Sequence, residues 1–376
     1  MRGWRGATAG AAAALAVLVA LAPRASSATG FLLTGSGALD HRELVGAQSL
    51  KLAAPSQVGI DSTTLELAAK LVVDVNPSLN VSVKACYGCH GFEVDQGYAE
   101  FQFGEHLNLR AGRFNVPVGE FNLRHDPANY TTPSKPLPYA MGDMVHYREF
   151  NLGVVPAPYS DNGLELFGSF WIQHLVQLDY TVYAVRGLVG SNDFDFKASR
   201  DVRDNNHTPA IGARVVATWR HLSVGGSLGG GYYDAQDRLR YAFYGAELYY
   251  SQGPFVLRAE AINRLTDYDV NAPGYPFVVN PAEPYFLKLG YYAQLDWKAL
   301  DWLTAIYRVD GVNRLGMPIP GSGLDGQYAS VLRHTVAASL RLDQNLLLKL
   351  GYEYWAFQGT AFEDIHAGRA ALVYSY

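Results

Sequence analysis

Residues 287–297 read LKLGYYAQLDW, and their hydrophobicity alternates from one residue to the next. Leu289 and Tyr291 fall on one face of this repeat, whereas Lys288 and Gln294 fall on the other. An alternation of period two is typical of a β-strand with one apolar and one polar face. The stretch therefore predicts a strand that separates two environments, one apolar and one aqueous.

The same alternation recurs along the chain in runs of about ten to thirteen residues, the length that a tilted strand needs to cross a bilayer. Because every backbone group in lipid must be paired, such strands must close into a barrel. We predict an all-β fold, a closed antiparallel transmembrane β-barrel of about 16 strands, in which Leu289 and Tyr291 face lipid while Lys288 and Gln294 face water. The segment 31–53 would supply one strand, and the others are expected at 64–75, 79–88, 92–103, 107–115, 162–170, 174–186, 209–219, 222–231, 239–250, 254–265, 285–297, 300–309, 330–342, 345–357 and 364–376.

The predicted connections alternate between short and long, although the strand assignment did not impose this. Short ones such as 76–78, 220–221 and 343–344 fall on one side of the barrel, and long ones such as 187–208 and 266–284 fall on the other. Bacterial barrels have short periplasmic turns and long outer loops. Rings that flank the short turns would form a girdle at the membrane interface. These rings belong to Phe170, Trp171, Trp219, Tyr249, Tyr250, Trp297 and Trp302.

Both ends of the chain carry export signals. Arg2 and Arg5 precede an apolar run from residue 11 to 22, and small residues at 26–28 follow it. This order predicts a secretory signal peptide over residues 1–28 and a single barrel domain over 29–376. The last strand ends in an aromatic residue, Tyr376, on its apolar face, which resembles the C-terminal signal that outer-membrane barrels present to their assembly machinery.

Composition excludes several other classes of protein. The formal net charge of −5 argues against nucleic-acid binding, which requires a basic surface. No His-Glu-x-x-His, Gly-x-Ser-x-Gly or phosphate-binding loop occurs, so we expect no catalytic residues and no metal site. The 38 glycines follow no Gly-X-Y period, which excludes a collagen-like chain.

Residues 107–119 read LNLRAGRFNVPVG and residues 98–101 read YAEF. These segments resemble the corresponding part of the phosphate-selective (OprO/OprP-like) outer-membrane porins. The resemblance implies a porin of about 16 strands, often a homotrimer, with one loop folded inward to narrow the pore. Residues 116–161, the longest predicted connection, are the candidate pore-constricting loop, and a simple surface loop is the alternative. Acidic and basic residues balance in this segment, so phosphate selectivity is not supported.

Charged residues in the polar phase of the strands are expected to face the lumen, because charges do not belong on the lipid face. Inward acids such as Glu66 accompany the bases, and a slight excess of bases favours anions. The alternative is that these charges pair across strands and support the wall. The predicted pore-lining residues are Arg110, Arg113, Glu120, Arg124, Arg214, Arg258, Glu260, Lys288, Arg308, Arg333 and Lys349.

Both cysteines lie in one motif, Cys86-Tyr87-Gly88-Cys89-His90. Cys-x-x-Cys-His is the attachment pattern of c-type haem, in which two thiols bind the porphyrin and the histidine ligates iron. The rival is a disulfide or a pair of free thiols, since an oxidising compartment favours disulfides. We expect the motif in a short outer connection, away from the pore constriction. Candidate second axial ligands, by residue type only, are His106, His125, Met141 and Met144.

The sequence thus predicts a porin-type channel in the outer membrane of a Gram-negative bacterium, for passive diffusion of small hydrophilic solutes or ions. Its partners would be outer-membrane lipid, those solutes and further copies of the chain in a homotrimer. We expect no cofactor. The alternative function is that of a barrel in an outer-membrane electron-transfer conduit, with covalent haem c at Cys86 and Cys89 and with His90 as an axial ligand.

Overall fold

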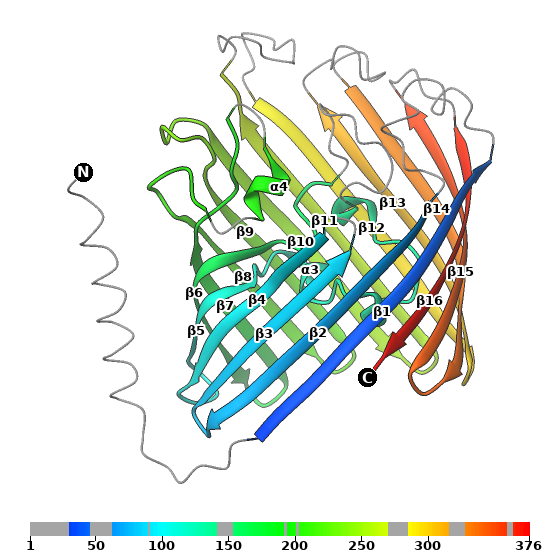
Figure 1. The fold of residues 1–376 in the computed structure, drawn as a ribbon, viewed down its shortest axis with the longest axis horizontal. Helices are drawn as coiled ribbons and strands as arrows, with labels where there is room; N and C mark the ends of the chain where they lie inside the picture. Colours follow the sequence, from blue (N-terminus) through cyan, green and yellow to red (C-terminus); the bar gives the residue numbers. More distant parts are fainter. Residues whose placement is uncertain are drawn as a thin grey trace.

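The computed structural model shows one closed β-barrel (Figure 1). It describes residues 30–45, 62–88, 91–140, 153–191, 194–200, 203–269, 285–315, 328–358 and 364–376. Each strand pairs antiparallel with its neighbours in the chain, and β1 pairs with β16 to close the barrel. The strands are β1 (Gly30–Val45), β2 (Ser62–Asn76), β3 (Leu79–Gly88), β4 (Gly91–Gln102), β5 (Asn108–Asn115), β6 (Ser160–Ile172), β7 (Val176–Val185), β8 (Ala210–Trp219), β9 (Leu222–Tyr232), β10 (Arg240–Gln252), β11 (Phe255–Asp267), β12 (Tyr285–Leu300), β13 (Leu303–Leu315), β14 (Tyr328–Asp343), β15 (Leu346–Gln358) and β16 (Ile365–Ser375).

This barrel confirms the predicted fold class and strand count. The segment 31–53 supplies β1, and the remaining strands begin and end within a few residues of the predicted bounds. The connections between β2 and β3, β4 and β5, and so on to β14 and β15 have two to five residues and meet at one end of the barrel, which we call the short-turn end. The C-terminus lies at that end, and the predicted signal peptide, residues 1–28, lies outside the described residues.

The outer surface of the barrel is apolar. Leu289 and Tyr291 lie on this surface, whereas Lys288 and Gln294 point inward, so the predicted phase of β12 is correct. The predicted girdle residues Phe170, Trp171, Trp219, Trp297 and Trp302 are each about half exposed near the short-turn end. Exposed aliphatic side chains continue the apolar surface, among them Leu39, Leu65, Leu164, Leu166, Val182, Leu295, Val336 and Leu372. A wall that is apolar outside and charged inside matches a strand barrel in lipid.

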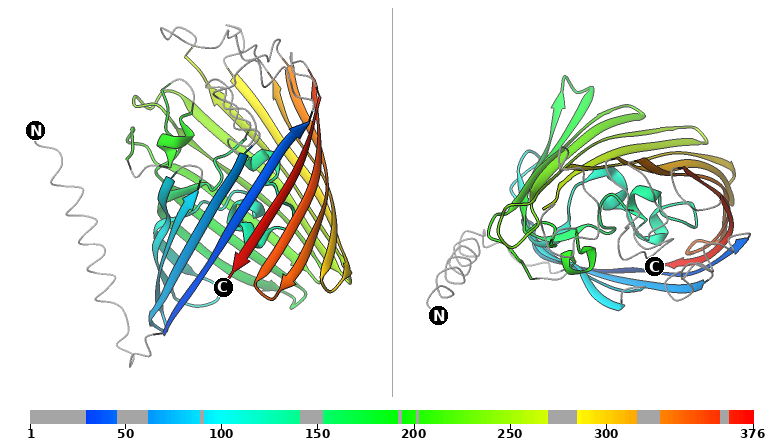
Figure 2. Two further views of the ribbon diagram at one scale, coloured as in Figure 1. Left: turned by 45° about the vertical axis from the view of Figure 1, so that its right-hand side comes forward. Right: turned by 90° about the horizontal axis from the view of Figure 1, so that it is seen from above.

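Short helical segments lie within the loops. They are α3 (Gly119–Leu123), η1 (Pro127–Asn129), η2 (Leu137–Tyr139) and α4 (Phe196–Ser199). No helix in the described ranges is both long and apolar enough to cross a membrane. The first three belong to residues 116–159, the connection from β5 to β6, which we call L3 and of which 116–140 and 153–159 are described. Figure 2 shows this segment inside the barrel, seen from above.

A hydrophobic core fills the lumen beside β5–β12. Buried rings such as Phe121 and Tyr159 of L3 pack there against inward rings of the wall, including Tyr183. Glycine makes room for these rings: a Cβ atom added at Gly212 would lie 2.2 Å from the Tyr183 hydroxyl, and one at Gly229 would lie 2.6 Å from it. One side of the barrel is therefore closed by packing, as in the interior of a globular protein.

Candidate functional site: the interior of the barrel

One carboxylate on β11 fastens two distant points of L3 to the wall. Glu260 accepts hydrogen bonds from the backbone N–H of Phe121 at 2.8 Å, from the hydroxyl of Tyr292 at 2.6 Å, and from the hydroxyl of Tyr139. Burial, together with the Glu260 carboxylate, raises the pKa of Tyr139 well above its ordinary value, so this phenol stays a donor. Glu260 was predicted to line the pore, but it lies beneath L3 and anchors it.

Arg308 of β13 holds the next part of L3. Its guanidinium donates to the hydroxyl of Thr132 at 2.7 Å and to the carbonyl and hydroxyl of Ser134 at 2.8 and 2.6 Å. Asp310, two positions along the strand, forms an ion pair with Arg308 at 3.1 Å and accepts from the backbone N–H of Leu137 at 3.0 Å. An arginine guanidinium presents several N–H donors in a rigid planar arrangement, so one side chain can make several hydrogen bonds at once.

Arg333 and Lys349, on β14 and β15, bind backbone carbonyls of L3. Arg333 donates to the carbonyl of Lys135 at 2.6 Å. Lys349 donates to the carbonyls of Pro127, at 2.6 Å, and Tyr130, and its ammonium lies 4.3 Å from the ring centre of Tyr130. Neither side chain is exposed to solvent. These two predicted pore-lining residues are therefore anchors of the loop.

The far end of L3 is held by β11 and β12. Arg264 donates to the carbonyl of Val154 at 2.6 Å, and Lys288 donates to that of Gly153 at 3.4 Å. Lys288 and Gln294 are only 3% and 5% exposed. The sequence was right that both face inward, but wrong that they face water, because L3 covers this part of the wall.

A charged cluster ties the first turn of L3 to β3 and β4. Lys84 forms ion pairs with Asp95 at 2.9 Å and with Asp126 at 2.5 Å, and its ammonium lies 3.3 Å from Nε2 of His125. Burial alone would raise the pKa of Asp126, but His125 and Lys84 outweigh burial and lower it. Asp126 therefore stays ionised within L3.

Three predicted residues lie on the inner wall and pair with acids of neighbouring strands. Arg110 pairs with Glu100 at 2.7 Å and with Glu165 at 2.5 Å, between the rings of Tyr98 and Phe167. Arg258 pairs with Asp296 at 2.6 Å, and Arg214 pairs with Glu247. These pairs agree with the alternative that inward charges support the wall.

The remaining three predicted residues lie close to the entry of L3. Arg113 is buried and donates to the carbonyl of Arg200, in the connection from β7 to β8, at 2.8 Å. Glu120 of α3 pairs with Arg124, the residue that follows this helix. The structure thus places most of the predicted set at L3, and Arg110, Arg214 and Arg258 in pairs along the wall.

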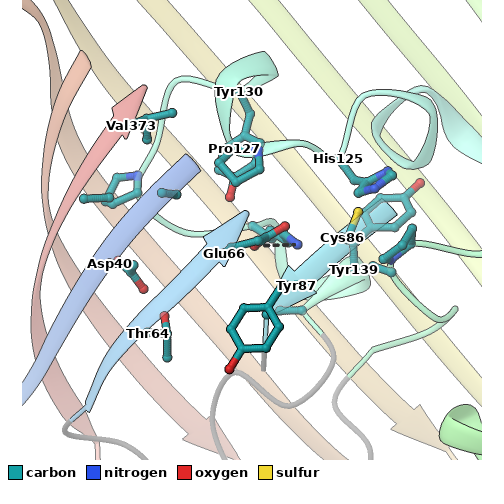
Figure 3. A pocket seen from close by; sticks show the side chains of 18 of the residues that line it. Asp40, Thr64, Glu66, Cys86, Tyr87, His125, Pro127, Tyr130, Tyr139 and Val373 are labelled. Carbon is teal, nitrogen blue, oxygen red and sulfur yellow. Dashed lines mark ion pairs between the residues drawn. The ribbon is translucent and has the colours of Figure 1, made fainter. Parts of the chain in front are cut away.

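A cavity of about 140 Å³ remains between L3 and the wall formed by β16 and β1–β4 (Figure 3). The wall contributes Asp40, Glu66 and Glu93, and L3 contributes Tyr130 and Lys135. The sequence prediction of pore-lining residues missed Asp40 and Glu93. Residues 31–53 have no clear alternation that would set their strand phase, and a register shift between β3 and β4 at Lys84 and Ala85 obscures the phase of β4. An inward position in the alternation of their strands is the only feature of the sequence that could have identified these two acids as lining residues.

Cys86 also lines this cavity, from β3. The expectation that the motif lies away from the constriction is therefore wrong for Cys86, which adjoins His125 of L3 (Figure 3). Cys89 and His90 lie outside the described residues, as do Met141 and Met144. His106 stacks on Phe170, with ring centres 4.9 Å apart, near the short-turn end.

The surroundings of Cys86 give the haem alternative no support. The residue lies on an extended strand, and the cavity beside it is smaller than the roughly 300–1,000 Å³ of typical ligand pockets. Within the described ranges, no group of three or more His, Cys, Asp or Glu side chains is arranged to hold a metal ion.

No protein-family model and no curated protein sequence matches the chain. Solved structures do match it over nearly its whole length. An anion-selective porin from Comamonas acidovorans superposes with a TM-score of 0.59 at 11% identity, covering 93% of this chain and all of that one. The fold is that of the outer-membrane porins.

Two further porin-fold structures agree. OmpF of Salmonella typhi, solved in complex with daunomycin, gives a TM-score of 0.57 at 13% identity over 92% of this chain and 97% of that one. The outer-membrane channel DcaP of Acinetobacter baumannii gives 0.54 at 10% identity over 94% and 99%. Identities this low establish the shared barrel alone.

Proposed function

We propose that this protein is a porin-type channel that lets small hydrophilic solutes or ions diffuse passively across the outer membrane of a Gram-negative bacterium. One observation carries the proposal: a closed barrel, apolar outside and charged inside, holds a long loop folded into its lumen. Such a loop leaves a passage narrower than the barrel, and a narrow charged passage filters solutes by size and charge. The channel performs no chemistry, so no catalytic residue is assigned.

The anchoring of L3 supports its assignment as the constriction. Its described part is bonded to β3, β11, β13, β14 and β15 through buried side chains. A loop held at so many points keeps one position, as a fixed filter must. Basic wall residues make most of these bonds, so the excess of bases does not by itself predict anion selectivity.

Conductance in planar bilayers tests the proposal. The purified barrel should form ion-conducting channels, and removing about 25 residues around Pro133–Tyr147 should raise the single-channel conductance, because the constriction rather than the barrel diameter limits flow. Liposome swelling with sugars of increasing size should show a larger size limit for the shortened protein. A folded barrel that conducts nothing would refute the channel, and unchanged conductance after shortening would refute the constriction.

Two finer points belong to this proposal. The homotrimer that the resemblance implies predicts an assembly about three times the mass of the chain in mild detergent, which light scattering measures.

The conduit alternative predicts a haem stain that stays with the chain on a denaturing gel and is lost in Cys86→Ser. A covalent haem signal would replace the channel proposal with the conduit.

A further inference from the structure

The outer surface of β13–β16, neighbouring strands in Figure 1, carries a row of polar rings. The hydroxyl of Tyr307 lies 2.8 Å from Nδ1 of His334, and that of Tyr352 lies 2.5 Å from Nδ1 of His366. The ring of Tyr354 stands between the two imidazoles, its centre 6.4 Å from that of His334 and 5.1 Å from that of His366. Ionisable side chains are rare on a surface that faces lipid. Contact with acyl chains alone therefore does not account for this row.

Strand position places the row at the outer edge of the membrane. His334 lies nine residues from the short-turn end of β14 at Asp343, and His366 lies nine residues from that of β16 at Ser375. Nine residues of a strand tilted by about 35–45° rise roughly 20–25 Å. The apolar band of a bacterial barrel is about 25 Å tall, and its short turns are periplasmic. Both imidazoles therefore lie where the acyl chains of the outer leaflet give way to headgroups.

The hydrogen bonds at Nδ1 decide what each imidazole presents to the outside. A neutral histidine carries its proton on one ring nitrogen, and the partner of the other nitrogen sets which one. A phenol hydroxyl donates to Nδ1, so the proton of His334 and of His366 is on Nε2, which has no hydrogen-bond partner among the described residues. His41 of β1 repeats the arrangement, with Nδ1 2.9 Å from the hydroxyl of Thr63. Three N–H donors on the outer surface are complementary to the oxygens of phosphate.

A groove on the outer surface adjoins the row. His41 of β1 and Tyr352 of β15 both line it, and Gly368 of β16 lies between them. A Cβ atom added at Gly368 would meet no atom within 4 Å, so this part of the surface is open. The outward aliphatic side chains that line the groove are Val336, Ala338, Leu350 and Ala370. The groove therefore offers an apolar surface for an acyl chain directly beside the histidines.

The acids near the row bear on the charge of a ligand. Asp364 accepts hydrogen bonds from the hydroxyl of Tyr354 at 2.6 Å and from the backbone N–H of Phe357 at 3.1 Å, so both its oxygens are engaged. Glu43 of β1 lines the groove and repels an anion there. The nearest arginine of the groove, Arg369, is buried and pairs with Asp40 on the inner side of the wall.

We propose that this surface binds a phosphorylated glycolipid of the outer leaflet. Nε2 of His334, His366 and His41 would donate to its phosphate groups, and an acyl chain would lie in the groove beside Gly368. The outer leaflet of a Gram-negative outer membrane is built from such lipids, so the ligand is present at this level of the barrel. The site faces away from the lumen and does not depend on the proposed channel function.

Native mass spectrometry of the purified barrel in mild detergent tests the site, with diphosphorylated lipid A as the probe. His334→Phe with His366→Phe keeps both rings and removes both donors. The half-saturating lipid concentration should rise about tenfold, the loss expected for two hydrogen bonds of ordinary net strength. Glu43→Gln removes an opposing charge and should strengthen binding. His106→Phe is the matched control, because His106 is an exposed imidazole near the short-turn end, and its binding of lipid A should be native.

The lipid and the protein can be varied independently. Removing the phosphates from lipid A should weaken its binding to the native barrel as much as the double variant does, and equal binding of the two lipids would overturn phosphate as the recognised group. Native affinity in the folded double variant would overturn the site. Displacement of lipid A by an equal concentration of inorganic phosphate would mean that free anions bind instead.

A second copy of the chain is the other occupant that the test separates. A native barrel that is multimeric while the double variant is monomeric would make this surface a contact between copies and overturn the lipid site. Heat-modifiable migration on gels confirms that each variant is folded, and either single variant, with about threefold weaker binding, carries the test if the double variant fails to fold. Conductance of the double variant should stay native, because the row lies outside the lumen.

Discussion

Glu260 offers the sharpest test of how L3 is held, because one side chain joins residues 121 and 139 of the loop to the wall. Glu260→Ala leaves three buried donors without an acceptor: the backbone N–H of Phe121 and the hydroxyls of Tyr139 and Tyr292. Each unsatisfied buried donor costs about 1–3 kcal/mol. Part of this loss of stability is offset, because the variant no longer has to bury a carboxylate, which itself costs several kcal/mol. Three such donors together cost about 3–9 kcal/mol, and the relieved burial of the carboxylate offsets several of these, so we expect a net loss of about 2–4 kcal/mol.

The loss should appear in two measurements. Urea unfolding in liposomes, followed by tryptophan fluorescence, should show the lower free energy of unfolding, and bilayer recordings should show noisier and larger currents as L3 detaches. Glu100→Ala is the control, because the hydrogen bonds of Glu100 join it to the wall residues Arg110, Asn80 and Gln102. Quiet, native-sized currents from folded Glu260→Ala would refute the anchoring argument.

Three further perturbations probe the wall, the closure of the barrel and the pH response. Leu289→Arg should cost about 2–4 kcal/mol near mid-membrane, whereas the same side chain at inward-facing Asp74 should cost little; equal unfolding free energies would mean that the strand phase is wrong. Deleting residues 374–376 removes the two 3.1 Å backbone bonds between Tyr376 and Gly35, and should leave unfolded, protease-sensitive protein in the periplasm; a normal yield of heat-modifiable barrel would contradict this. The lowered pKa of Asp126 means that its ion pair stabilises the docked loop fully above the unfolded value of about 3.9, and that this stabilisation declines as pH falls below that value toward the lower pKa of the folded state. Native channel noise should therefore rise in acid, and Asp126→Asn should be noisy at every pH; quiet currents from folded Asp126→Asn at neutral pH would exclude this role.

The strands could be predicted because their pattern is local. Alternation within ten residues sets which side of a strand is apolar, and for β12 it assigned Leu289 and Lys288 to the correct faces. Alternation cannot say whether an inward side chain meets water or protein. Gln294 shows the difference, since it donates to Thr131 of L3 at 2.9 Å and is buried.

The sequence by itself determined the barrel, a count of about 16 strands and the common end of its short turns, and it singled out residues 116–161 as the candidate constricting loop. Only the tertiary structure decided that Arg308, Arg333 and Lys349 hold this loop. The reason is separation along the chain: Lys349 bonds to a carbonyl 222 positions away, and Arg333 to one 198 positions away. Periodicity reports on neighbours a few residues apart, whereas such contacts exist only once the barrel has closed around L3.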